Sequence, residues 1–173
     1  MSKIVLTLGS IAGIILVIML GLSLAFSSGE MDAQSMKFSE IIGYATMIIA
    51  LSLIFFGVRA HRDNALNGHI GFGQAFQIGL LITLVASFFY VVGWMILSNI
   101  LAPDFMDQYA EFTLKSMQES GASVSEIKAA EAEMEKYRQY YENPLLKAGL
   151  TFMEIFPVGL IISLISAIIL RKK

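Results

Sequence analysis

One acidic residue inside a long apolar segment is the strongest candidate for chemistry in this sequence. Glu154 is the only charged residue between Ala148 and Leu170. A charged carboxylate at the centre of a membrane-spanning helix costs about 2.5 kcal/mol or more unless it is paired or protonated. Pro157, one turn later, lacks the backbone N–H that would bond to the Met153 carbonyl. An acid beside such an irregularity is typical of a proton or cation site.

A structural role for Glu154 is the favoured interpretation. The residue follows the start of its apolar segment by little more than one turn, where a carboxylate is able to reach water. Negative charge near a helix N-terminus is also favourable. Tyr44, Trp94 and Ser98 are expected at a similar depth, and together with Glu154 and Pro157 they form one candidate polar site at the membrane interface.

A second group of polar side chains lies in a short basic segment. Arg59, His61, Arg62 and Asp63, followed by His69, form a candidate cytoplasmic loop. Histidine and carboxylate groups bind zinc, but this spacing is not that of a helical ligand pair and a fourth ligand is missing. We therefore expect a solvated loop whose arginines hold anionic lipid headgroups, with no metal and no other cofactor.

The rest of the composition excludes several classes of function. The chain of 173 residues has no cysteine, which rules out disulfides, thiolate catalysis and zinc sites built on cysteine. It contains no H-E-x-x-H, G-x-S-x-G or Walker-type motif. The net charge of −2 gives no reason to expect a nucleic acid partner. A membrane enzyme is therefore the least favoured functional class.

Four long apolar segments carry these candidate residues. Hydrophobic residues make up 56% of the chain and charged residues 15%, whereas soluble domains carry roughly 25% charged residues. A bilayer core about 30 Å thick needs roughly 20 apolar residues in a helix, and only helices satisfy their own backbone in such segments. We predict an all-α integral membrane protein, with one four-span membrane domain over 1–173 and spans at 4–26, 41–58, 78–101 and 149–170.

The first apolar segment also has features of a cleaved signal peptide. Ala25 and Ser27 supply a small-residue cleavage pattern. Against this, the segment 4–26 is longer than the roughly 7–15 residues of a signal core, and Lys3 is the only basic residue before it. A retained helix is favoured.

The positions of Lys and Arg predict the orientation. Basic residues concentrate at the N-terminus, in 59–74 and at the C-terminus, whereas an equal number is spread over the longer segments 27–40 and 102–148, which hold most of the acids. Because basic residues near span ends mark the cytoplasmic side, both termini are expected in the cytoplasm of a multi-pass protein. Lys147 is the one residue against this orientation.

The segment 104–142 predicts a helical hairpin between the third and fourth spans. Ser123 and Glu126 form a capping-box pattern, and Gly121 before them is suited to a helix C-terminus. The apolar residues recur at helical spacing, but the hairpin is too small to hold a core of its own. We expect it to pack on itself, on the membrane surface or on a protein partner through Asp104–Asn143.

Small residues at helical spacing predict close helix packing in lipid. Packing within the chain is favoured, and homo-oligomerisation is the alternative. The residues concerned are Gly9, Gly13, Gly79, Ala86, Gly93, Gly159 and Ser163.

Several motifs resemble those of a known family. They are Phe56-Gly-Val-Arg-Ala-His-Arg-Asp63, Gly71-Phe-Gly-Gln-Ala-Phe76, Pro103-Asp-Phe105 and Glu154-Ile-Phe-Pro-Val-Gly159. Together they cover nearly the whole chain, which resembles an uncharacterised bacterial family of small four-span membrane proteins, the domain of unknown function 4199. The resemblance implies a location in the bacterial inner (cytoplasmic) membrane, and it implies no activity.

Two functions from different classes stay open. The favoured one is a non-enzymatic interaction, accessory or scaffold protein that uses its outer hairpin, which fits the missing catalytic motifs. The alternative is a small oligomeric transporter or channel in which Glu154 is a protonatable site.

Overall fold

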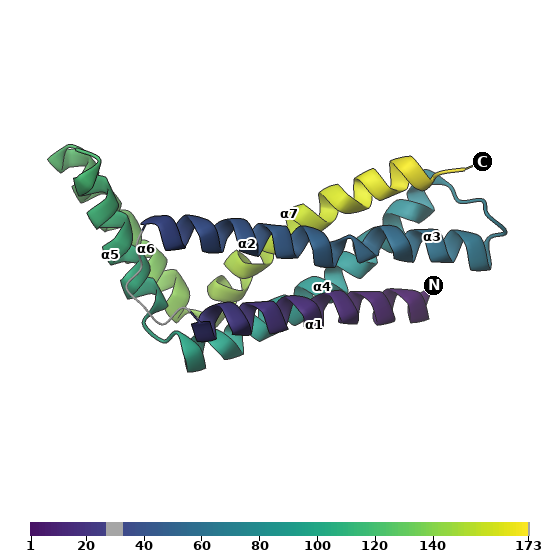
Figure 1. Cartoon of the computed structure of the whole chain (residues 1–173), viewed down its shortest axis with the longest axis horizontal. Coiled ribbons are helices and arrows are strands. Elements are labelled where there is room, and N and C mark those ends of the chain that lie inside the picture. The colour runs from purple at the N-terminus through teal and green to yellow at the C-terminus, as the bar shows by residue number, and fades with distance from the viewer. Residues whose placement is uncertain (27–32, 173) are drawn as a thin grey trace.

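The protein is built from helices joined by short connections (Figure 1). The computed structural model describes residues 1–26 and 33–172. In this part of the chain, four stretches are long and apolar enough to cross a membrane, which are Ser2–Ala25, Ser39–Ala65, Phe72–Leu101 and Pro144–Leu170. The predicted all-α fold with four candidate transmembrane segments is confirmed. The helices are α1 (Ser2–Phe26), α2 (Ala33–Leu51), α3 (Leu53–Ala65), α4 (Phe72–Leu101), α5 (Phe105–Glu119), α6 (Val124–Glu142) and α7 (Pro144–Leu170).

The long helices form an elongated bundle whose two ends differ. Both chain termini and the connection between α3 and α4 lie at one end, which we call the terminal end (Figure 1). Helices α5 and α6 lie at the opposite end, the hairpin end, and extend beyond the bundle. An even number of crossings accounts for the two termini sharing one end.

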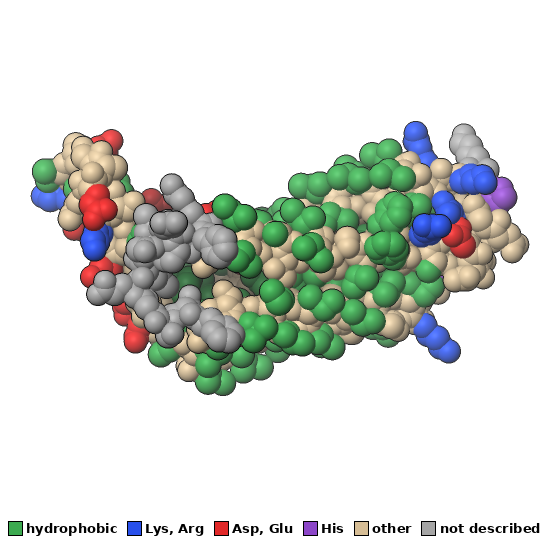
Figure 2. Space-filling model, in the orientation of Figure 1, with side chains coloured by type: hydrophobic (Ala, Val, Ile, Leu, Met, Phe, Trp, Pro, Cys, Tyr) green, Lys and Arg blue, Asp and Glu red, His purple; other side chains and the backbone are tan. Residues whose placement is uncertain are grey.

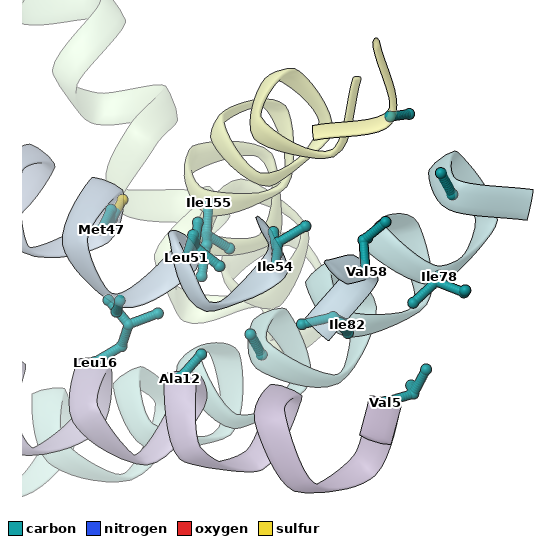
Figure 3. Packing of buried hydrophobic residues seen from close by; sticks show 14 of the residues in the cluster. Val5, Ala12, Leu16, Met47, Leu51, Ile54, Val58, Ile78, Ile82 and Ile155 are labelled. Carbon is teal, nitrogen blue, oxygen red and sulfur yellow. The ribbon is translucent and has the colours of Figure 1, made fainter. Parts of the chain in front are cut away.

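Helix α4 is the central element, because it packs against α1, α3 and α7. The core between these helices is aliphatic, with Ile54, Ile78, Ile82 and Ile155 fully buried (Figure 3). Hydrophobic side chains also cover the outside of the bundle, whereas charged side chains gather at its two ends (Figure 2). An apolar exterior between two charged ends is the pattern expected of a bundle that faces lipid.

Glycines bring α1 against α4. A Cβ atom added at Gly13 would lie 2.5 Å from the Cβ atom of Phe89, and one added at Gly9 would lie 2.6 Å from that of Val85. The reverse contact occurs at Gly93 of α4, where an added Cβ would lie 2.5 Å from Val17. Two backbones approach this closely only where side chains are absent.

Small residues also join α4 to α7. An added Cβ at Gly79 would lie 2.9 Å from the Cβ of Ser163, and one at Gly159 would collide with Thr83. The Thr83 and Ser163 hydroxyls lie 3.1 Å apart at hydrogen-bonding distance. Each hydroxyl also lies within hydrogen-bonding distance of a carbonyl of its own helix, at Gly79 and Gly159. Because each hydroxyl has one proton, one of them donates across the interface while the other donates to its own helix. Ala86 of α4 is also fully buried. The small residues predicted from the sequence therefore lie at contacts between helices of this chain.

The second span is interrupted at Ser52, where we expected one helix over 41–58. The Ser52 hydroxyl donates to the Ile49 carbonyl at 2.6 Å. The Phe55 N–H bonds to the Ser52 carbonyl at the tighter three-residue spacing, 3.0 Å. Serine hydroxyls that bond back to the preceding turn compete with helix geometry and bend it. The span therefore consists of α2 and α3 in succession.

The expected loop over 59–74 is mostly helical, and this part of the prediction is wrong. Helix α3 continues to Ala65 and α4 begins at Phe72, so the connection is only 66–71. Asn67 and Gly68 have φ angles of 51° and 83°, as a tight turn requires. Ile70 and Lys172 then exchange two backbone hydrogen bonds of 2.9 and 3.0 Å, which fasten the end of the chain to this connection.

The outer hairpin has the helix signals expected from its sequence. Gly121 has a φ of 79° beyond the end of α5. At the start of α6, the Ser123 backbone N–H donates to the Glu126 carboxylate at 2.7 Å, and the Ser123 hydroxyl caps the Glu126 N–H. The Ser123 hydroxyl also donates to the Glu126 carboxylate at 2.7 Å, and this bond, followed by the bond from the Ser123 backbone N–H, lowers the pKa of Glu126. At the start of α7, the side-chain oxygen of Asn143 accepts from the backbone N–H groups of Leu145 and Leu146.

The close approach of α1 to α4 predicts a position-specific cost of adding one methyl group. Gly13→Ala forces a Cβ into Phe89, and we expect the free energy of unfolding to fall by about 1–3 kcal/mol. Gly43→Ala is the matched control, because nothing lies within 4 Å of its added Cβ. Titration with denaturing detergent in mixed micelles measures both. Equal stability of the two variants would refute this packing.

Candidate functional site

The predicted polar site around Glu154 lies at the hairpin end, where α4, α6 and α7 meet. The Tyr90 hydroxyl of α4 donates to Oε2 of Glu154 in α7 at 3.3 Å. Tyr90 is 6% exposed. Tyr90 is not among the site residues predicted from the sequence. The two residues meet because α4 and α7 run antiparallel in one particular register. The sequence pattern of a single helix does not specify that register.

Glu154 itself is open on one side. Protein atoms surround most of its carboxyl group, yet the residue keeps an exposed surface on the outside of the bundle. Among the lysine and arginine side chains that the structure describes, none forms an ion pair with it. The carboxylate therefore has a hydroxyl donor but no counter-ion from this part of the chain.

The other predicted members of the site differ in their burial and in their hydrogen bonds. The Ser98 hydroxyl donates to the Trp94 carbonyl at 2.6 Å, and both residues are buried. The indole N–H of Trp94 is buried without a hydrogen-bond partner among the described residues. Tyr44 of α2 is 45% exposed and lies within electrostatic reach of Tyr90. Pro157 does not interrupt α7, which continues to Leu170.

Lys147, the one residue against the predicted orientation, is packed into this end of the bundle. It is only 7% exposed. Its ammonium group donates to Oδ1 of Asn99 at 3.1 Å and lies 5.4 Å from the centre of the Tyr141 ring. An amide oxygen and an aromatic face both stabilise a cation. The residue that opposed the orientation rule is therefore a packing element between α4, α6 and α7.

An aromatic cluster joins the base of the hairpin to α4. Phe105 meets Trp94 edge to face at 5.2 Å between ring centres and stacks on Tyr141 and Tyr109 at 6.2 Å. Burial, followed by the negative charge of Glu154, raises the pKa of Tyr141 to about 12. Edge-to-face and offset stacked rings are the favourable aromatic geometries. We call Trp94, Phe105, Tyr109 and Tyr141 the base cluster.

The second predicted group lies on the last turns of α3 at the terminal end. Asp63 lies 2.7 Å from Arg62 and 3.6 Å from Arg59. A guanidinium nitrogen of Arg62 also donates to the Leu170 carbonyl at 3.5 Å, and His61 is 6% exposed. The described residues contain no group of three or more His, Asp or Glu side chains placed to hold a metal ion. The arrangement ties α3 to the end of α7.

The base cluster contains the only tryptophan of the chain, which makes it directly observable. Phe105→Ala removes the ring against Trp94, and we expect Trp94 fluorescence to shift to longer wavelength as water reaches the indole. Phe88→Ala is the control, since Phe88 is 65% exposed on the outside of α4. An unchanged emission spectrum in Phe105→Ala would show that the hairpin base does not cover Trp94.

Comparison with known proteins gives one family. No curated protein and no solved structure matches the chain. The family model described as "Protein of unknown function (DUF4199)" matches residues 7–172, in agreement with the resemblance of the sequence motifs. Because this match spans nearly the whole chain, the protein belongs to the DUF4199 family.

Proposed function

We propose that the protein is a non-enzymatic membrane protein that presents the α5–α6 hairpin to a partner protein. The observation that carries the proposal is the way the hairpin is held. It extends past the hairpin end of the bundle (Figure 1), and its contacts with the bundle involve its base. There the base cluster and the packing of α6 on α7 attach it.

The hairpin is also braced internally. Its two helices pack on each other around the buried side chains of Ala110 and Met134. The guanidinium of Arg138 in α6 lies 2.8 Å from the Asp107 carboxylate in α5. A surface that is ordered before it binds loses less conformational entropy on association. These contacts support a rigid binding element.

The charge of the hairpin indicates the kind of partner. The segment 104–142 contains nine acidic and four basic residues. Glu131, Glu133 and Glu142 are exposed on α6 and form no ion pair with the described residues. Acidic surfaces attract partners with basic surfaces and raise their rate of encounter. The proposed partner therefore carries a basic surface outside the bilayer.

The proposal includes an orientation in a bacterial inner membrane. Lys3, Arg59, Arg62, Arg171 and Lys172 belong to the terminal end, whereas Lys173 lies outside the described residues. By the rule that basic residues near span ends stay in the cytoplasm, the terminal end is cytoplasmic. The hairpin is then on the outer side of the membrane.

The absence of cysteine makes this orientation easy to measure. Ser120→Cys lies between α5 and α6, and Ser2→Cys lies at the start of α1. In intact cells from which the outer membrane has been removed, we expect a membrane-impermeant maleimide to label Ser120→Cys and not Ser2→Cys. Lysis should expose both thiols. The opposite labelling pattern would reverse the orientation.

The partner hypothesis predicts that binding depends on the charge of α6. A photo-crosslinking side chain at Lys128, which is exposed near the start of α6, should capture a distinct membrane or periplasmic protein. The double change Glu131→Lys with Glu133→Lys should abolish the crosslink, because it places like charges opposite a basic surface. Glu131→Gln with Glu133→Gln is the matched control and should weaken it less.

Two results would count against the partner hypothesis. A crosslink that persists in the charge-reversed variant would exclude the acidic surface as the binding site. A crosslink only to a second copy of the chain would replace the partner protein with a homo-oligomer.

Transport is the second candidate function, and one observation favours it. Glu154 is an exposed carboxylate within a spanning helix and accepts a hydrogen bond from Tyr90 on the neighbouring span. Intramembrane acids of this kind often mark ion pathways. Proton flux in liposomes that disappears in Glu154→Gln would support transport, whereas liposomes that stay proton-tight with the native chain would exclude proton flux.

A further inference from the structure

The charge of Glu154 lacks a counter-ion among the side chains that the structure describes. The nearest basic residue on its own helix is Lys147, two turns earlier. Lys147 is engaged by Asn99 and the Tyr141 ring, and it forms no ion pair with Glu154. A carboxylate at this depth is costly unless a cation or a proton accompanies it. The Glu154 carboxylate therefore has no positive partner among these side chains, and a positive group from outside the chain would supply one.

The groups around the carboxylate define which cation fits. Tyr90 touches it, and Tyr141 of α6 lies within electrostatic reach. Aromatic faces attract organic cations through the negative charge of their ring faces. The surroundings therefore offer one carboxylate and the rings of two tyrosines.

A metal ion is a poor match for these groups. Calcium takes six to eight oxygen ligands, and magnesium keeps an octahedral shell that includes several waters, so both ions need a polar, hydrated site. The described residues contain no cluster of three or more acidic or histidine side chains. A weakly hydrated organic cation needs only one carboxylate and apolar contacts. It partitions into lipid, which would border the exposed side of Glu154 if α7 spans the membrane.

From these contacts, we propose that Glu154 and Tyr90 form a binding site for an organic ammonium group that reaches the carboxylate from the bilayer. The ammonium belongs either to a lipid headgroup such as phosphatidylethanolamine or to a free lipophilic cation. The ammonium pairs with the carboxylate of Glu154, Tyr90 orients that carboxylate, and neighbouring rings contact the alkyl groups. The site rests on neither proposed function, because binding requires neither the hairpin partner nor movement across the membrane.

Binding to the purified full-length chain tests the site. In dodecyl maltoside micelles, which contain no amine, equilibrium dialysis should show saturable binding of tetrabutylammonium. Glu154→Gln should weaken that binding by about tenfold or more, as expected for loss of a charged partner. Glu154→Asp, which keeps the charge, should retain more of it. Tyr90→Phe should weaken it by a smaller factor.

Two controls separate this site from nonspecific attraction and from misfolding. Glu40→Gln removes an exposed carboxylate of α2 and should leave binding unchanged. Native Trp94 emission should persist in every variant, because Trp94 reports the fold of this end. Equal binding by the native chain and Glu154→Gln would overturn the site.

Competition between added lipids and tetrabutylammonium identifies the source of the ammonium group. Adding phosphatidylethanolamine to the micelles should displace tetrabutylammonium if the headgroup is the natural occupant, and phosphatidylglycerol should not. Equal weak effects of the two lipids would assign the site to free organic cations. If tetrabutylammonium does not bind saturably and phosphatidylethanolamine does not co-purify with the native chain more than with Glu154→Gln, the proposal is wrong.

Discussion

The close approach of α4 to α1 and α7 is the interaction on which the rest of the structure depends. Lipid is as apolar as leucine, so burial of apolar surface does not drive helices together in a bilayer, and contact depends on packing and polar bonds. In this bundle the packing comes from Gly13, Gly93 and Gly159, where an added Cβ would collide with the facing helix. The bond between Thr83 and Ser163 adds a polar contact in the same interface.

The position of α4 determines how the side chains at the hairpin end of the bundle are arranged. Its last turns carry Tyr90 to Glu154 and Trp94 to Phe105, so one helix positions both the polar site and the hairpin. The two features then share neighbours, because Tyr141 stacks on Phe105 and its pKa is raised partly by the charge of Glu154. The candidate cation site and the proposed partner surface are therefore adjacent while depending on different side chains.

Much of this architecture was predictable because it depends on local signals. Apolar length predicts spans, and the pattern of Ser123 and Glu126 predicts the start of α6. The break at Ser52 was missed because serine is common in helices and its hydroxyl is free to bond back or outward. The helical state of Arg59–Asp63 was missed because charged residues near a span end look like a loop. The pairings of Tyr90 with Glu154 and of Lys147 with Asn99 depend on the register between helices, which one sequence does not contain.

A distance measurement between the hairpin and the bundle tests the central claim most directly, which is that the bundle holds the hairpin as a rigid extension. The cysteine-free chain accepts spin labels at Gln118 near the end of α5 and Ile96 on the exposed side of α4. Pulsed electron resonance in bilayers should give one narrow distance distribution, which broadens in Phe105→Ala. A broad distribution in the otherwise native chain would show a hairpin that moves freely and would contradict the account.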